Sequence, residues 1–328
     1  MLAAGCNAPS VGEHATIGRA AELWDDEQDL VAGDSAELDQ FGYSLAVSGD
    51  RAIVGAYGDA SFRGAAYIFV RENGAWIEEQ KLVASDGASG DNFGWSVALS
   101  DDQALVGAYG ASGYRGAAYV FARGGDGWTE EQKLTVDDGV ENDQLGYSVG
   151  IDEDTALIGA YGRDANRGAA YVFSKESGTW DGGQKLVAAD GLADDDFGYA
   201  VAVAGRWVVV GAPGDDHYRG SVYVFESDGI AWARAQKLLA TGGAESEQFG
   251  NSVSVAGDRA LVGAYWSADF RGAAHVFVRK NQAWEVEQTL VASDGDVGHR
   301  FGNAVSLVDG RALIGASRYQ QGLGAAYV

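Results

Sequence analysis

The sequence predicts an all-β protein, a six-bladed β-propeller whose blades each contain four antiparallel strands. One observation is a period of 52 residues that runs without insertion or deletion. A Phe-Gly pair, replaced once by Leu-Gly, opens each copy, and the copies start at residues 41, 93, 145, 197, 249 and 301. The other observation is that each copy holds four short segments rich in β-forming residues. Repeats of this length bury their apolar faces against neighbouring copies, and four antiparallel strands per repeat are typical of a propeller.

The first copy shows how the four strands follow one another. Residues 41–47 alternate large and small side chains, a period of two that indicates a strand. A turn at 48–51 leads to a second strand at 52–57, and a loop at 58–63 leads to a third at 64–70. A turn with Gly74 precedes a fourth strand at 76–82, and the acidic linker 85–92 leads to the next copy. Short strands joined by such turns favour antiparallel hairpins.

The first strand has a flat face of small residues. In the first copy this face consists of Gly42, Ser44 and Ala46, and the second copy repeats it. We expect these strands to be innermost, because small side chains let neighbouring blades approach closely around the axis.

The two ends of the sequence are expected to share one blade. Residues 24–30 precede 76–82 by 52 positions and predict an isolated fourth strand, whereas residues 325–328 form a third strand without its fourth. Pairing of these two segments would complete the sixth blade and remove an open sheet edge. A fragment of a seven-bladed propeller and a solenoid of stacked coils remain as alternatives. The predicted organisation is an N-terminal tether at 1–19 and one propeller domain at 20–328.

Composition argues against several kinds of partner. The formal net charge of −25 would repel nucleic acid and anionic lipid headgroups, so no nucleic acid partner is expected. We interpret the acidity as keeping a β-rich surface soluble. No apolar run approaches the roughly 18 residues that a membrane-spanning helix needs, and no membrane span is expected.

The N-terminus contains the sole cysteine, Cys6, at the end of a Leu-Ala-Ala-Gly-Cys sequence. This segment resembles the bacterial lipobox, which implies lipidation of Cys6 and a lipid anchor. The basic segment and apolar core that a secretory signal requires do not precede it in the sequence, so a chance alanine-rich terminus with an inert thiol is the alternative. Asn7 is not the aspartate that favours inner-membrane retention. The expected location is extracytoplasmic, as an outer-membrane or cell-surface lipoprotein or a secreted protein.

A second motif accompanies the Phe-Gly pair. The second strand ends in Gly211-Ala212-Pro213 in the fourth copy, in Gly-Ala-Tyr in four copies and in Gly-Ala-Ser in the last. Together the two motifs resemble the FG-GAP repeat of integrin α-subunit propellers and of many bacterial surface proteins. The resemblance covers nearly all of residues 21–328 and implies a propeller that binds partners outside the cytoplasm, as in protein binding and cell adhesion.

Calcium is not expected between the first and second strands. Integrin-type repeats often carry a calcium loop there, but the corresponding turn in this sequence, as at 48–51, is too short to supply the roughly 6 to 8 oxygens that calcium needs. A weaker candidate for a calcium site is the acidic run Asp194, Asp195 and Asp196 in a linker. No other cofactor is expected.

The loops between the second and third strands and the linkers between blades should open on one face, which we call the linker face. An arginine recurs there before a glycine, and acidic residues recur in the linkers. We predict a ring of interblade salt bridges between these groups, since a guanidinium suits paired carboxylates. The arginines of this ring are Arg63, Arg115, Arg167, Arg219 and Arg271.

The residue after each Phe-Gly pair varies between copies and should lie near the mouth of the central channel. Variation divides the ring into an aromatic arc and an amide arc, a surface that could stack and hydrogen-bond a sugar or peptide. Packing between blades is the alternative. The candidate ligand-binding residues are Tyr43, Trp95, Tyr147, Tyr199, Asn251 and Asn303.

Catalysis is not expected, because the four histidines occupy unrelated positions in the repeat and offer no metal-ligand spacing. The leading hypothesis is a noncatalytic binding or scaffold propeller that engages protein or glycan through the linker face. One alternative is a carbohydrate-active propeller enzyme, a glycosidase or lyase, which would need two converging carboxylates. The other is a structural surface protein without a small ligand.

Overall fold

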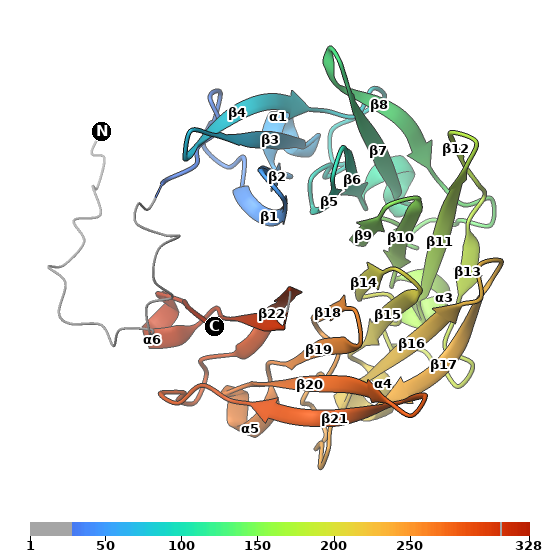
Figure 1. Cartoon of the computed structure of the whole chain (residues 1–328), viewed down its shortest axis with the longest axis vertical. Coiled ribbons are helices and arrows are strands. Elements are labelled where there is room, and N and C mark those ends of the chain that lie inside the picture. Colours follow the sequence, from blue (N-terminus) through green and yellow to red (C-terminus); the bar gives the residue numbers. More distant parts are fainter. Residues whose placement is uncertain (1–27, 309) are drawn as a thin grey trace, which may run out of the picture.

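The computed structural model describes residues 28–308 and 310–328. Within these residues six antiparallel sheets are arranged as blades around a common axis (Figure 1), and the prediction of an all-β six-bladed propeller is confirmed. In each blade the chain runs outward from the axis, one strand at a time. The predictions for residues 1–27, including the tether at 1–19 and lipidation of Cys6, lie outside the described residues.

The strands take the predicted order. First strands are β1 (Phe41–Ser48), β5 (Ser96–Ser100), β9 (Ser148–Asp152), β14 (Ala200–Ala204), β18 (Val253–Ala256) and β22 (Phe301–Val308). Second strands are β2 (Arg51–Ala56), β6 (Gln103–Ala108), β10 (Thr155–Ala160), β15 (Trp207–Ala212), β19 (Arg259–Ala264) and β23 (Arg311–Ala316). Third strands are β3 (Ala65–Glu72), β7 (Ala117–Gly124), β11 (Ala169–Glu176), β16 (Ser221–Ser227), β20 (Ala273–Lys280) and β24 (Ala325–Tyr327). Fourth strands are β4 (Ala75–Leu82), β8 (Gly127–Leu134), β12 (Thr179–Trp180) with β13 (Gln184–Leu186), β17 (Trp232–Leu238) and β21 (Ala283–Leu290).

A one-turn segment between the second and third strands was not predicted. These segments are α1 (Asp59–Phe62), α2 (Ala111–Tyr114), α3 (Arg163–Asn166), α4 (Asp215–Tyr218), α5 (Ser267–Phe270) and α6 (Tyr319–Gly322). In α1 the residues Ala60, Ser61 and Phe62 have φ of 49°, 63° and 62°, so the turn is left-handed. Such backbone costs a non-glycine residue roughly 1–2 kcal/mol. The turn offsets this cost by holding the next linker, because the Phe62 carbonyl accepts hydrogen bonds from Gly90 N and Asn92 N at 3.1 and 2.9 Å.

Neighbouring blades meet closely along the inner strands, as the small residues predicted. The Ser44 hydroxyl donates to the Gly94 carbonyl of the next blade at 2.9 Å, and three further copies repeat this bond at 2.8–2.9 Å. A Cβ at Gly55 would overlap the same Gly94 carbonyl oxygen, which explains the glycine at the end of the second strand. Farther out, the apolar core lies between blades, where Ile53 and Ile68 of one blade cluster with Phe93 and Tyr119 of the next.

The first and sixth blades are the two end blades in the series of six. Leu45 on β1 is 69% exposed and Leu313 on β23 is 47% exposed, whereas Leu261, which matches Leu313 one repeat earlier, is fully buried. Figure 1 shows β1 and β22 apart. Among the described residues the sixth blade has three strands, and the fourth strand expected from residues 24–30 falls largely outside them.

The described start of the chain nevertheless takes the position expected for the end of a fourth strand. Gln28 exchanges two hydrogen bonds with the Trp76 backbone, both at 2.7 Å. Gln80 makes the same pair of bonds to Trp128 one repeat later, at 2.7 and 2.8 Å.

Candidate ligand-binding face

The residues after the Phe-Gly pairs lie on the linker face. Each one lies near the start of an inner strand, beside the end of the second strand and the left-handed turn that follows it. The alternation along β1 therefore places Tyr43 at the channel mouth, next to Tyr57 of the Gly-Ala-Tyr motif. Tyr43 is 49% exposed.

Four of the predicted residues form one continuous row of rings across four blades. The ring centroids of Tyr43 and Trp95 are 4.5 Å apart, those of Trp95 and Tyr147 5.5 Å, and those of Tyr147 and Tyr199 5.2 Å. These spacings are typical of aromatic pairs in contact. The rings therefore pack between blades, as one alternative predicted, and still leave a partly exposed surface.

A second row of tyrosines, which the sequence analysis did not single out, lies directly against the first. Tyr57, Tyr109 and Tyr161 contact Tyr43, Trp95 and Tyr147 at centroid distances of 4.6, 4.7 and 4.3 Å. The signal was present in the recurring Gly-Ala-Tyr motif, whose tyrosine follows directly after the second strand. We call the two rows together the aromatic belt; its members are Tyr43, Tyr57, Trp95, Tyr109, Tyr147, Tyr161 and Tyr199.

The belt ends in the fourth blade, where Pro213 replaces the second tyrosine. In the fifth blade Asn251 is only 9% exposed and its amide donates to the carbonyls of Gly302 and Asn303 at 3.3 and 3.2 Å. Asn251 thus connects two blades, while the Asn303 side chain in the sixth blade is exposed. The predicted amide arc is therefore divided between a buried and an exposed residue.

Asp196 brings a half-buried carboxyl to the end of the belt. Burial, and then the neighbouring carboxylates of Asp194 and Asp195, raise its pKa to about 7. Burial also raises the pKa of Tyr43 to about 12, with a smaller contribution from Tyr57. At neutral pH the Tyr43 phenol is consequently neutral, whereas the Asp196 carboxyl changes its charge near pH 7.

The predicted calcium cluster is not assembled at this point. The Asp195 carboxylate turns inward and accepts a hydrogen bond from Leu192 N at 2.6 Å, whereas Asp194 accepts one from the Asn166 amide at 3.1 Å. The Asp194 and Asp195 carboxylates thus bond to different protein groups. Across residues 28–308 and 310–328, no group of three or more His, Cys, Asp or Glu side chains could hold a metal ion.

The linkers are held by lysines, which corrects the predicted arginine ring. Lys81 donates to Asp34 at 2.7 Å, and the lysine and aspartate pairs of the next three blades lie at 2.7, 3.1 and 2.8 Å. A buried tyrosine of the third strand joins each pair; Tyr67 donates to Asp34 at 2.8 Å. The hydrogen bond from Lys81 is the main reason why the pKa of Asp34 is lowered.

The arginines take other partners. Arg167 pairs with Asp164 of its own turn at 3.0 Å, and Arg219 pairs with Asp216 at 2.8 Å. Of the five predicted arginines, only Arg219 reaches a described linker carboxylate, Glu245, at 3.7 Å. Among the described residues Arg63, Arg115 and Arg271 form no ion pair. Their position just after the left-handed turn serves the backbone, because the Arg63 carbonyl accepts from Phe93 N at 3.1 Å.

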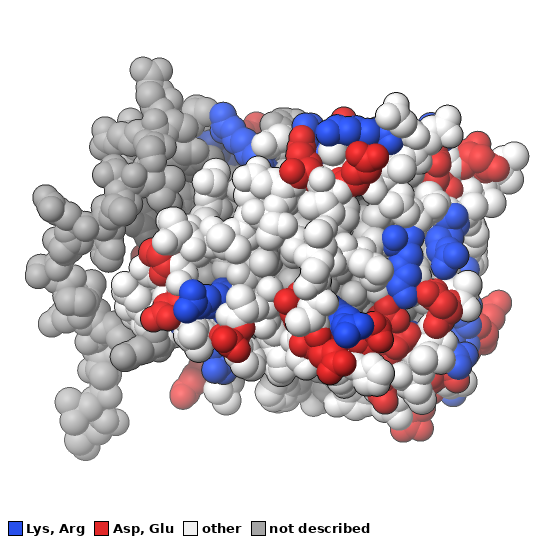
Figure 2. All heavy atoms as spheres, turned by 90° about the horizontal axis from the view of Figure 1, so that it is seen from below, with Lys and Arg blue, Asp and Glu red and all other residues white. Residues whose placement is uncertain are grey.

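Charged side chains of both signs lie next to one another on the rim of the ring, as Figure 2 shows from one side. Within the part of the chain that the structure describes, no helix is long and apolar enough to cross a membrane.

The family model for the FG-GAP repeat matches six segments of the chain, residues 24–69, 76–121, 128–173, 180–225, 232–277 and 284–328. The chain belongs to the FG-GAP repeat family. No curated protein matches it.

Two solved structures share the fold of this FG-GAP protein. One is a functionally unknown protein from Desulfotomaculum acetoxidans, with a TM-score of 0.56 and 10% identity over 88% of this chain and 82% of that one. The other is hydrazine synthase from Kuenenia stuttgartiensis, with a TM-score of 0.56 and 11% identity over 87% of this chain and 82% of that one. At these identities the likeness concerns the fold alone.

Proposed function

We propose that this FG-GAP protein is a noncatalytic binding propeller that engages a glycan or a protein segment through its aromatic belt. The aromatic belt is the observation that carries the proposal. Scaffold residues recur in every blade, but the belt occupies blades one to four and stops at Pro213 and Asn251. A patch that breaks the symmetry of the repeat on an open face has the character of a binding surface.

The chemistry of the belt suits a ligand with both apolar and polar faces. Tyrosine and tryptophan rings supply flat apolar area at low cost in conformational entropy, and their polar edges donate hydrogen bonds. Sugars and extended peptides both have this mixed character, and the belt is long enough to contact several units of either.

The experiment is a screen of the purified protein on glycan and peptide arrays, with Trp95→Ala as the test variant. Trp95 contacts Tyr43, Tyr57, Tyr109 and Tyr147, so it lies at the centre of the belt. We expect one ligand class to bind the unmodified protein and the variant to lose most of the signal. Absence of binding on both arrays would favour a structural surface protein.

One observation favours an enzyme as the second candidate. A carboxyl with a pKa of about 7, as in Asp196, is suited to proton transfer at neutral pH. A glycosidase or lyase would lose at least 100-fold of its turnover in Asp196→Asn, while ligand binding would persist. This candidate is rejected if Asp196→Asn binds the ligand as tightly as the unmodified protein does and the unmodified protein turns over no array ligand.

We propose an extracytoplasmic location with a lipid anchor at Cys6, supported by the lipobox resemblance and by membership of a family found on bacterial surfaces. The test is expression of the full gene with metabolic palmitate labelling. The proposal expects label in the membrane fraction that Cys6→Ser abolishes, and unlabelled protein would contradict it.

A further inference from the structure

Two arginines of the sixth blade, on the face that carries the aromatic belt, depart from the repeat. Arg300, the last residue of the linker that enters this blade, stands where the fourth blade has Asp196 and the other blades have an amide. Arg318, directly before α6, stands where the first four blades have a glycine and the fifth has Trp266. Each substitution adds positive charge at a position that is neutral or acidic in the other blades.

The repeat brings these two positions together. In the second blade a Cβ at Gly110 would lie 2.8 Å from the Asn92 amide nitrogen. Arg318 and Arg300 take the same two positions in the sixth blade, where Arg318 N donates to the neighbouring His299 carbonyl at 3.2 Å. The two guanidinium groups therefore extend from adjacent points of the backbone.

Arg300 lies next to the end of the aromatic belt. Its guanidinium carbon is 5.5 Å from the centre of the Tyr265 ring, in the preceding blade. Tyr265 takes the outer-row position beyond the gap that Pro213 leaves. Burial raises the pKa of Tyr265, the Tyr199 phenol adds to this rise and the Arg300 charge opposes it. Tyr265 thus lies within electrostatic range of both, and it connects the last ring of the belt to Arg300.

Neither arginine is neutralised by the described residues, among which their guanidinium groups form no ion pair and no hydrogen bond. The acids of the same linker bond to other groups. Asp294 accepts from the hydroxyls of Tyr319 and Tyr327 at 2.9 and 2.8 Å. Asp296 accepts from Val297 N at 2.7 Å.

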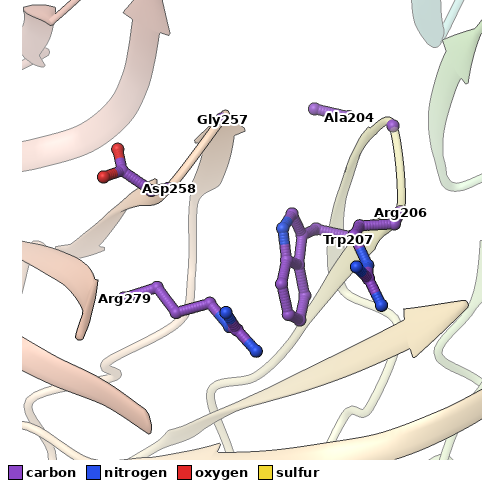
Figure 3. A pocket seen from close by; sticks show the side chains of 7 residues that line it. Ala204, Arg206, Trp207, Gly257, Asp258 and Arg279 are labelled. Carbon is purple, nitrogen blue, oxygen red and sulfur yellow. The ribbon is translucent and has the colours of Figure 1, made fainter. Parts of the chain in front are cut away.

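Arginines on the opposite face of the ring show the paired state. At the seam between the fourth and fifth blades the Trp207 ring lies between Arg206 and Arg279, at 5.7 and 4.7 Å (Figure 3). Glu226 pairs with Arg206 at 2.6 Å and with Arg279 at 3.8 Å, and Asp258 lines the same cleft. Carboxylates of the protein balance that cleft, whereas no described carboxylate pairs with the two arginines of the sixth blade.

The half-buried carboxyl of the belt lies away from these arginines. Burial raises the pKa of Tyr161 in the third blade, and the Asp196 charge contributes to this rise. Arg300 acts instead on Tyr265, two blades farther on. The linker face therefore has a carboxyl at one end of the row of rings and cations at the other. A ligand that follows the rings would place a negative group at the cationic end.

A sugar chain fits the groups of this face better than a peptide does. Phenol hydroxyls both donate and accept hydrogen bonds, as sugar hydroxyls do, and flat rings can stack on the faces of successive sugar units. The exposed Asn303 amide, whose backbone N donates to the Arg300 carbonyl at 3.2 Å, adds a further donor and acceptor. Extended peptides are often recognised through rows of backbone N–H and C=O groups, which the rings of the belt do not supply.

We propose that the aromatic belt binds an acidic oligosaccharide and that Arg300 and Arg318 hold a uronate carboxylate of this ligand. A planar guanidinium can donate two parallel hydrogen bonds to one carboxylate. Stacking on the rings supplies contact area, and the carboxylate fixes the direction of the sugar chain along the belt. This inference names the ligand class of the proposed binding function and therefore rests on it.

The chain offers variants that restore what other blades contain and should therefore fold. Arg300→Gln restores the amide of the first, third and fifth blades, and Arg318→Gly restores the glycine of the first four. The control Arg115→Gln removes an exposed arginine of the same face that lies outside the belt. Trp95→Ala reports on the belt itself.

Titration calorimetry at low salt would compare charged and neutral forms of the same sugars. The probes are tetramers of galacturonate, of mannuronate and of glucuronate, each beside its neutral methyl ester. A tetraglutamate peptide with blocked ends carries the same number of carboxylates on a peptide backbone.

We expect at least one uronate tetramer to bind the unmodified protein and Arg115→Gln about tenfold more tightly than its ester, with a preference that shrinks as salt is added. Arg300→Gln should bind acid and ester about equally, and Arg318→Gly should show a reduced preference. Trp95→Ala should weaken both forms in the same proportion. The melting temperatures of the two arginine variants should stay within about 2 °C of the unmodified protein.

Three results would overturn the inference, and they separate it from the proposed function. Equal binding of acid and ester by the unmodified protein, with both weakened in Trp95→Ala, would leave the belt as a binding surface for neutral glycans. A preference for the acid that persists in both arginine variants, or tighter binding of tetraglutamate than of every uronate, would remove the assigned role of the arginines or the glycan. If no tetramer binds in either form, the inference fails and the proposed function rests on peptide ligands alone.

Discussion

Asp196 illustrates how one residue can change the behaviour of a repeated surface. The equivalent position is an amide in four other blades, Gln40, Asn92, Gln144 and Gln248. An amide can remain half-buried at any pH. A carboxyl there is favoured only when protonated, which is why burial raises its pKa to about 7.

The raised pKa has a defined consequence for stability. The pKa of Asp196 is higher in the folded protein than in the unfolded chain, so the group destabilises the fold increasingly as the pH rises from about 4 through 7. We expect Asp196→Asn to raise the melting temperature at pH 8 by roughly 2–4 °C and to leave it unchanged near pH 4. Thermal melts of both proteins across this range measure the difference. A difference that stays constant with pH would contradict the assigned pKa.

At the residue scale the sequence located the inner row of the aromatic belt but not its outer row or its limits. Tyr43, Trp95, Tyr147 and Tyr199 could be identified because the residue after the Phe-Gly pair differs between copies, whereas the pair itself recurs. Asn251 was assigned to the same surface on position alone, and its burial arises from an interblade hydrogen bond that sequence spacing does not reveal.

The left-handed turns are the elements that sequence reasoning missed. Ala60, Ser61 and Phe62 have no intrinsic preference for positive φ, and the turn forms because the next linker bonds to its carbonyls. Local propensity therefore gives no signal, although Gly113 in the second blade occupies the position of Ser61.

Strain in these turns can be relieved by one substitution. Glycine in place of Ser61 removes a left-handed cost of roughly 1–2 kcal/mol and adds a smaller entropic cost in the unfolded chain. We expect Ser61→Gly to raise the melting temperature by about 1–2 °C relative to Ser61→Ala, which also removes the hydroxyl. Scanning calorimetry compares the two. A lower midpoint for the glycine variant would show that the turn is not strained.

The lysine and aspartate pairs explain why the linkers are ordered without the five predicted arginines, and Arg163 adds a bond to the third linker, to Asp138 at 2.8 Å. Both residue types were visible in the sequence, but the pairing depends on the depth of the fourth strand, which places Lys133 over the Tyr119 ring at 5.2 Å and within 2.7 Å of Asp86. The predicted arginines are nearer in sequence to these aspartates, as Arg115 is to Asp86, but the lysines form the pairs.

A double-mutant cycle measures the coupling free energy between the lysine and the aspartate of one such pair. We expect Asp86→Ala and Lys133→Ala each to lower the free energy of unfolding, and the double variant to lose about 0.5–1 kcal/mol less than the sum. The coupling is modest because Asp86 is half exposed. Urea denaturation gives the four free energies. Additive losses would mean that the pair does not hold the linker.

At the scale of the whole molecule, the period of 52 residues predicts the number and order of the blades because each seam repeats the same contacts. The two end blades are different, since Leu45 and Leu313 are exposed and no described residue covers Leu313 as the next blade covers its equivalent Leu261. The sequence could not show this, because the periodic pattern of apolar residues continues unchanged to both ends.

The exposed ends can be compared with an internal seam. Leu261→Ala should lower the free energy of unfolding by roughly 2–5 kcal/mol, because its side chain is fully buried. We expect Leu313→Ala to cost less than half as much, because this side chain is 47% exposed. Urea titrations of both variants provide the comparison. Equal losses would show that the face of the sixth blade is covered in solution.

The central claim is that the aromatic belt is a binding surface rather than packing between blades alone. The most direct measurement is the affinity of the strongest array ligand, by titration calorimetry, for the unmodified protein, Trp95→Ala and Phe270→Ala. Phe270 is 39% exposed on the same face but belongs to the fifth blade, outside the belt. We expect Trp95→Ala to lose at least tenfold in affinity, about 1.4 kcal/mol or more, and Phe270→Ala to bind normally. Unchanged affinity in Trp95→Ala, with a lowered melting temperature, would contradict the claim and leave the belt as packing.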